Sequence, residues 1–167
     1  MVYQSLFMNI SENTVALSGG GEPNNKEILM VNVSNAQFEF ESGPELIEGR
    51  TMHACGTFVH QNQTTVIVTG GVFNGGVWLT STELWVPGSS QGWVQGPSIP
   101  EPCYKGSLIT KPDQSGVILI GCFHVPTIYE LTEENGTLVW KNMTQTVKYM
   151  RQNPVTMLIP DELVTCH

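Results

Sequence analysis

The sequence has little charge for its length, and positive charge is especially scarce. Charged residues make up 13 % of the 167 residues, against about 25 % in typical soluble domains. Seven Lys and Arg residues are spread thinly along the chain, and the formal net charge is −8. Nucleic-acid binding depends on basic side chains that neutralise several phosphates. We therefore expect no nucleic-acid partner.

Long hydrophobic runs are also missing. No stretch approaches the roughly 18 apolar residues that a membrane-spanning helix requires, so we expect no membrane insertion. The segment Met1–Glu12 has no charged start followed by an apolar core, which a secretory signal peptide would have. This segment instead predicts a strand that is already in progress.

The sequence lacks closely spaced metal ligands and a convincing nucleophile motif. Cysteines at 55, 103, 122 and 166 form no C-x-x-C pair, and histidines at 53, 60, 124 and 167 have no H-x-x-x-H spacing. Residues 88–92 match G-x-S-x-G, but they lie in a predicted turn between two strands, whereas a nucleophile elbow needs a following helix. We predict no catalytic residue, no metal and no cofactor.

Turn-forming residues, in contrast, are plentiful, with 17 Gly and 10 Pro. This composition favours short strands joined by many turns, and it predicts an all-β fold. Three apolar runs each end in a pair of small residues: Gly19-Gly20, Gly70-Gly71 and Gly121-Cys122. The first glycines stand at 19, 70 and 121, so both intervals are 51 residues. Equal intervals of this length indicate a structural repeat.

Each repeat continues with the same series of elements. A second predicted strand follows the small-residue pair, and an aromatic residue then begins the next strand. A Gly-Pro turn closes the first two units, at Gly43-Pro44 and Gly96-Pro97, but is missing from the third. Large aromatics on an outer strand fill the gap between neighbouring sheets. We assign this role to Phe38 (or Phe40), Trp93 and Trp140.

The apolar run with Gly-Gly, the Trp before Gly-Pro and the Gly49-Arg50-x-x-His53 start of the second unit together resemble the kelch repeat. The resemblance covers residues 14–143 and implies a β-propeller of four-stranded blades. It implies about three blades plus a partial fourth, forming part of a larger propeller whose missing blades come from the same or another chain. The predicted segments are 1–13 (an incoming strand), 14–48, 49–100 and 101–149 (three repeats) and 150–167 (the partial fourth).

The resemblance implies a non-catalytic scaffold whose loops bind a protein partner, with glycan binding as a variant. Phe73, Trp78 and His124 lie in loops after the small-residue pairs and are the predicted partner contacts, because aromatics are enriched at interface hot spots. An intracellular ubiquitin-ligase adaptor with a BTB or F-box segment is the alternative function. A copper-radical oxidase, suggested only by the adjacent Cys103 and Tyr104, is the remote one.

Two features bear on the compartment. Cys103 and Cys122 flank a predicted hairpin centred near Asp113, which would place them opposite each other and allow a disulfide. The Asn-x-Ser/Thr acceptor pattern for N-glycosylation is frequent. Together these features resemble secreted invertebrate-type kelch proteins and predict an extracellular location, with a cytoplasmic location as the alternative. The acceptor asparagines are Asn9, Asn32, Asn62, Asn135 and Asn142.

Overall fold

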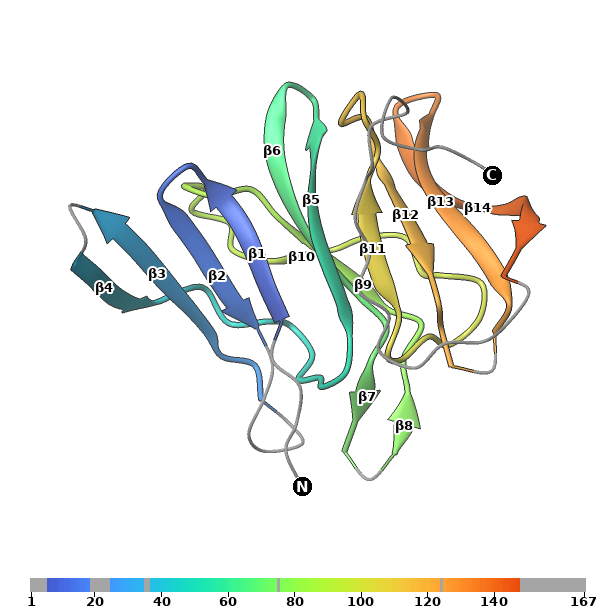
Figure 1. The fold of residues 1–167 in the computed structure, drawn as a ribbon, viewed down its shortest axis with the longest axis horizontal. Helices are drawn as coiled ribbons and strands as arrows, with labels where there is room; N and C mark the ends of the chain where they lie inside the picture. Colours follow the sequence, from blue (N-terminus) through green and yellow to red (C-terminus); the bar gives the residue numbers. More distant parts are fainter. Residues whose placement is uncertain (1–5, 19–24, 35–36, 75, 124, 148–167) are drawn as a thin grey trace, which may run out of the picture.

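The computed structural model describes residues 6–18, 25–34, 37–74, 76–123 and 125–147. Within these ranges the chain forms antiparallel sheets and contains no helix, so the all-β prediction is confirmed. Gly19, Gly20, His124 and the predicted fourth unit lie outside the described residues. Three four-stranded sheets lie side by side in the order in which they occur along the chain (Figure 1).

The three sheets follow one another along the chain. The first sheet contains β1 (Leu6–Ser11), β2 (Thr14–Ser18), β3 (Ile28–Ser34) and β4 (Gln37–Ser42), in that order. The second contains β10 (Val94–Gln95), β9 (Thr82–Trp85), β6 (Gln63–Thr69) and β5 (Ala54–His60). The third contains β11 (Ser107–Thr110), β12 (Val117–Ile120), β13 (Thr127–Glu134) and β14 (Thr137–Thr146).

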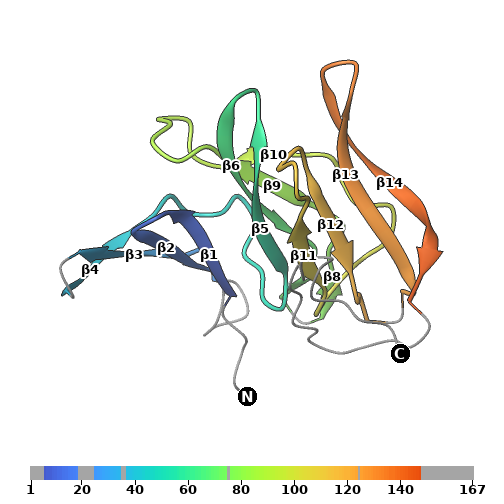
Figure 2. The same cartoon turned by 45° about the horizontal axis from the view of Figure 1, so that its top comes forward.

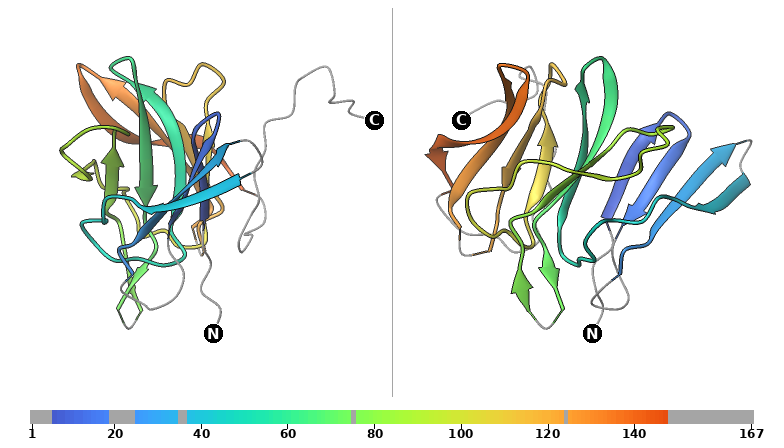
Figure 3. Two further views of the ribbon diagram at one scale, coloured as in Figure 1. Left: turned by 90° about the vertical axis from the view of Figure 1, so that its left-hand side faces the viewer. Right: turned by 180° about the vertical axis from the view of Figure 1, so that it is seen from behind.

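The molecule has two distinct ends. A separate hairpin of β7 (Val72–Phe73) and β8 (Val77–Trp78) projects from one end. The tips of the β5–β6, β11–β12 and β13–β14 hairpins lie at the other end in every view (Figures 1, 2 and 3). We call these ends the β7–β8 end and the hairpin-tip end.

Strand register shows which aromatic residues are equivalent. Phe40 pairs with Val31 in the first sheet, and Trp140 pairs with Leu131 in the third. In the second sheet Val94 pairs with Leu84, which places the preceding Trp93 beside Trp85, with ring centroids 5.8 Å apart. Phe40, rather than Phe38, therefore stands where the other sheets have tryptophan.

The core lies between neighbouring sheets. Ala16, Ile28 and Met30 of the first sheet pack against Val66 and Val68 of the second, together with its two tryptophans. The opposite face of the second sheet packs against the third, through residues such as Phe58, Ile67, Val117 and Leu131. A strand places alternate side chains on opposite faces, so the central sheet can bury both.

The glycine pair of the second unit lies where the backbone is crowded. Gly70 and Gly71 have φ values of 65° and 97°, which L side chains rarely adopt. A Cβ atom on Gly70 would lie 2.1 Å from the carbonyl oxygen of Cys103. The amide of Gly71 donates to the same oxygen at 2.6 Å. Glycine thus allows the segment around Cys103 to approach this turn.

Short irregular segments precede strands β5 and β11. The strands themselves begin at Ala54 and Ser107. Lys105 has a φ of 58°, a conformation that interrupts an extended strand. Before the other strand, Arg50 turns inward and is fully buried.

Arg50 and His53 connect the loop before β5 to its surroundings. The Arg50 guanidinium binds the carboxylate of Glu83 at 2.5 Å, and both side chains are 0 % exposed. Glu83 also accepts hydrogen bonds from the amides of Ile47 and Glu48, at 2.7 and 3.0 Å. His53 Nε2 lies 2.7 Å from Ser18 Oγ of the first sheet. These contacts fix the loop between the first two sheets.

Candidate functional site

Three aromatic rings meet beside the β7–β8 hairpin. The ring centroids of Trp78 and Tyr104 are 4.8 Å apart, and those of Tyr104 and Phe123 are 5.0 Å apart. Interplanar angles of 42° and 51° give both pairs a tilted contact, which suits the charge distribution of aromatic rings. We call these three residues the aromatic row. It joins the second unit to the third.

The aromatic row is open to solvent along part of its length. Trp78 is 46 % exposed, and the adjacent Val77 is 56 % exposed. Tyr104 and Phe123 are half-buried. Burial raises the pKa of Tyr104 above its ordinary value, and a tyrosine phenol is uncharged at neutral pH even without this shift. The row therefore offers a neutral, largely apolar contact surface.

A disulfide lies directly behind the aromatic row. Cys103 and Cys122 are bonded, with Cα atoms 5.0 Å apart, and the disulfide prediction is confirmed. The Cys103 amide donates to the carbonyl of Leu79 at 3.3 Å, and the Phe123 amide donates to the carbonyl of Tyr104 at 3.1 Å. Covalent and backbone bonds thus hold the loops that carry the three rings.

Lys105 adds one positive charge at the margin of the row. Its Nζ lies 6.0 Å from the centroid of the Phe123 ring, at the outer limit of a cation–π contact. The Lys105 amide donates to the carbonyl of Met52 at 2.8 Å, which fixes the backbone beside Tyr104. The row can therefore meet an apolar partner surface that has an acidic group at its edge.

The three predicted contact residues differ in where they lie. Trp78 belongs to the aromatic row, and Phe73 is half-buried on β7, paired with Val77. His124 lies outside the described residues. Sequence reasoning did not select Tyr104 as a contact, and it included Phe123 only as the first residue of the candidate contact loop 123–126. Each directly follows a cysteine of the predicted disulfide, and that signal could have brought them together.

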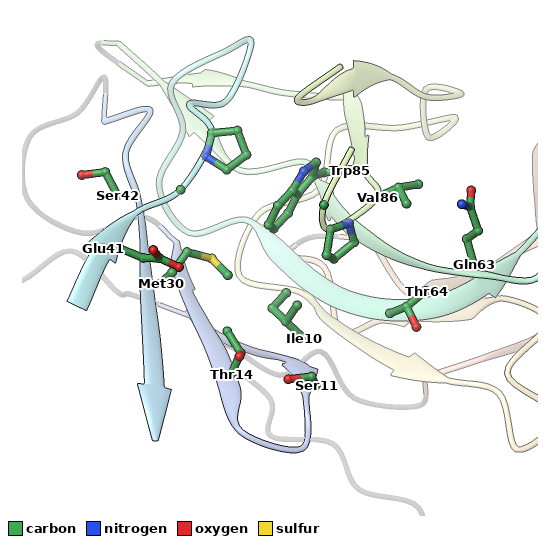
Figure 4. Close-up of a pocket in the computed structure, with 14 residues that line it drawn as sticks. Ile10, Ser11, Thr14, Met30, Glu41, Ser42, Gln63, Thr64, Trp85 and Val86 are labelled. Carbon is green, nitrogen blue, oxygen red and sulfur yellow. The ribbon is translucent and has the colours of Figure 1, made fainter. Parts of the chain in front are cut away.

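A cleft of about 710 Å³ opens between the first and second sheets (Figure 4). Ile10, Met30 and Trp85 contribute apolar surface, while Glu41 and Gln63 contribute polar groups. Glu41 is the single ionisable side chain among the described residues that line it. The cleft therefore offers shape and hydrogen bonding, without a second ionisable group to form an acid–base pair with Glu41.

Two features of the described residues bear on metal chemistry and on membranes. No cluster of three or more His, Cys, Asp or Glu side chains that could hold a metal occurs in these ranges. The sulfur of Cys103 is bonded to Cys122, so it is not available to modify a tyrosine as a copper-radical site would require. The same ranges contain no helix long and apolar enough to cross a membrane.

Comparison with known proteins identifies the fold alone. No family model and no curated protein matches the sequence. The chain is similar to a solved structure described as "Structure of YjhT", with a TM-score of 0.61 and 12 % sequence identity. The match covers 83 % of this chain and 45 % of that one, so the chain spans less than half the length of its structural neighbour. The likeness indicates a propeller-like arrangement of the sheets.

Proposed function

We propose that the chain is a non-catalytic binding module from a kelch-type β-propeller and that it contacts a protein partner through the aromatic row. The observation that carries this proposal is the contact of Trp78, Tyr104 and Phe123 at a partly exposed surface. Aromatic anchors provide much of the binding energy at protein interfaces. Loops held by a rigid scaffold are a common place for such anchors.

The bracing of the row supports binding rather than a purely structural role for its rings. A side chain that is already ordered loses less conformational entropy when a partner binds. The disulfide behind Tyr104 and Phe123 supplies that order before binding. An aromatic cluster needed only for the core would leave less of Trp78 in solvent than the observed 46 %.

Exposed apolar residues on the first sheet support membership of a larger propeller. Phe40 is 64 % exposed, whereas the equivalent Trp93 is 6 % exposed between two sheets. Phe38, Leu29 and Val33 are also exposed, at 63 %, 39 % and 37 %. Paired strand positions place these four residues on one face. A preceding blade, packed as the first sheet packs on the second, would cover this face.

An extracellular location is the second part of the proposal. Disulfides persist mainly in oxidising compartments, and the bond between Cys103 and Cys122 is compatible with one. Binding surfaces that operate outside cells also benefit from such covalent bracing. The location is tested by finding this disulfide intact in the chain isolated from its native source without reduction.

The binding proposal is tested with a defined probe. Peptides selected from a phage-displayed library on the wild-type chain are synthesised and titrated against variants. Trp78→Ala and Tyr104→Ala are each expected to weaken binding at least tenfold, as hot-spot truncation does. Phe38→Ala removes an exposed aromatic ring from the first sheet and is expected to leave binding unchanged.

Two results would contradict the proposal. Peptides that bind Trp78→Ala as tightly as wild type would place recognition outside the aromatic row. If Phe38→Ala weakened peptide binding equally, the peptides would be binding non-specifically to exposed aromatic residues rather than to one site. Thermal unfolding of each variant separates lost binding from lost folding.

A further inference from the structure

The five glycosylation acceptors divide into two groups by their position in the fold. Asn9, Asn32 and Asn142 lie within strands β1, β3 and β14. Asn62 and Asn135 lie instead in the two-residue turns that join β5 to β6 and β13 to β14. A glycan is bulky and needs a surface position, which a hairpin tip provides.

The backbone at these two tips suits asparagine. Asn62 has a φ of 60° and Asn135 a φ of 51°, in the left-handed region that asparagine tolerates better than most residues. Both asparagines are exposed, as are Thr64 and Thr137, which complete the acceptor patterns. Asn32, by comparison, is half-buried in a central strand that pairs on both sides.

The two tips lie close to each other. His60, which ends β5, has its Nδ1 3.1 Å from the carboxylate of Glu133 near the end of β13. The amide of Val59 also donates to the carbonyl of Gln114 at the β11–β12 tip, at 2.8 Å. The hairpin-tip end is thus a contiguous surface, opposite the β7–β8 hairpin (Figures 1 and 3).

We propose that Asn62 and Asn135 carry N-linked glycans and that these glycans cover the hairpin-tip end, leaving the aromatic row bare. This inference rests on the proposed extracellular location. The donor is an oligosaccharide linked through a diphosphate to a lipid. A bond forms between asparagine Nδ2 and C1 of the first sugar. The bond from C1 to the diphosphate oxygen breaks, and Nδ2 gives up one proton as the lipid diphosphate leaves.

The positions of the acceptor asparagines give the two ends of the molecule different proposed roles. Glycans at Asn62 and Asn135 would cover the hairpin-tip end with bulky, hydrated groups. No acceptor lies in the 70–82 or 98–106 segments, which flank the aromatic row, or in residues 121–126. A protein partner can therefore approach the row without meeting a glycan attached to those segments.

The test uses the full chain passed through the secretory pathway of a eukaryotic cell. The product is treated with peptide N-glycosidase in ¹⁸O water, and mass spectrometry reads conversion of each asparagine to labelled aspartate. Labelling is expected at 62 and 135. Thr64→Ala should remove labelling at 62 only, and Thr137→Ala at 135 only. These variants leave the asparagine turns unchanged, and Asn74→Gln, at the β7–β8 end, should remove neither label.

Several outcomes would overturn the inference. Unlabelled asparagines at both tips, in a chain whose Cys103–Cys122 bond has formed, would do so while leaving the extracellular proposal standing. Labelling confined to Asn142 or Asn32 would also overturn it. A native chain isolated with reduced Cys103 and Cys122 and without glycans would remove both proposals together. Tighter peptide binding at Trp78 after glycan removal would refute the claim that the row is bare.

Discussion

The indole Nε1 of Trp93 donates a hydrogen bond to the carbonyl oxygen of Pro44 at 2.9 Å, across the boundary between the first and second sheets. The same contact recurs at the next boundary, where Trp140 Nε1 donates to the carbonyl of Pro97 at 3.1 Å. An outer-strand tryptophan and the Gly-Pro turn of the preceding unit therefore form a repeated joint between sheets.

Truncating this joint should destabilise the protein. Trp93→Ala removes a 6 % exposed ring together with its hydrogen bond, and we expect a loss of about 3–5 kcal/mol in the free energy of unfolding. Phe40→Ala, at the exposed equivalent position, should cost no more than about 0.5 kcal/mol. Urea unfolding followed by circular dichroism compares the two. Similar losses in both variants would refute the joint.

The buried ion pair of Arg50 and Glu83 should be costly to break. Glu83→Gln removes the nearer counter-charge of the buried guanidinium and leaves Glu48, at 3.6 Å, as its remaining carboxylate partner. We therefore expect a loss of about 3 kcal/mol, the lower end of the cost of breaking a buried pair. Glu134→Gln serves as the control, because the pair of Glu134 with Lys141 is solvent-exposed and is expected to contribute at most about 1 kcal/mol. Denaturant midpoints measure both. If Glu83→Gln left the free energy of unfolding nearly unchanged, the hydrogen bonds that this side chain accepts from the Ile47 and Glu48 amides, rather than its charge, would account for its contribution.

His53 should make stability depend on acid pH. Burial, with a smaller contribution from the Arg50 charge, lowers the pKa of His53 from 6.5 to about 3. The unfolded chain therefore binds one more proton than the folded chain between these values. Stability from this group is complete above pH 6.5 and is lost as pH falls toward 3.

The expected slope is about a tenfold loss in the folding equilibrium constant per pH unit. Urea unfolding between pH 7 and pH 4 measures it for wild type and for His53→Gln. The difference in stability between the two proteins should shrink as the pH falls. A difference that stays constant over this range would mean that His53 titrates normally in the folded state.

Removing the disulfide should weaken folding and binding together. Cys103 and Cys122 are 19 residues apart, and closing a loop of this size stabilises by about 3 kcal/mol. The double variant Cys103→Ser/Cys122→Ser should lose about that amount and should bind row-selected peptides more weakly. Calorimetry and peptide titration measure the two effects. Full retention of binding at a temperature where the variant is folded would show that the row does not need the brace.

Local sequence patterns were sufficient for some elements of the fold. The apolar runs before Gly70 and Gly121 became β6 and β12, because a short apolar run that ends in a turn-forming glycine is a local signal for a buried strand. The Cys103–Cys122 bond was also predicted, although Cys103 lies before β11 and the register of β11 with β12 does not place it opposite Cys122. The sequence could not show whether Phe38 or Phe40 is the equivalent of the tryptophans. Both residues lie on the same face of β4, and only the hydrogen-bond register with β3 distinguishes their positions.

Long-range contacts account for what the sequence did not reveal. Arg50 meets Glu83 33 residues later in the chain, and no local pattern pairs them. Tyr104 lies between Trp78 and Phe123 because the β7–β8 hairpin and the two segments joined by the disulfide meet there. The aromatic row is therefore a product of tertiary folding, although each member was visible in the sequence.

The exposed face of the first sheet, which carries Phe40, has a consequence for the cooperativity of unfolding. Each sheet packs mainly on its sequence neighbours, and such arrays transmit stability through nearest-neighbour interfaces. The second sheet is held on both faces, whereas the first is held on one. Amide hydrogens of β3 should therefore exchange with solvent sooner than those of β6, although both are central strands. Covering Phe40 would slow that exchange, and the protection of β3 would then report on whatever docks there.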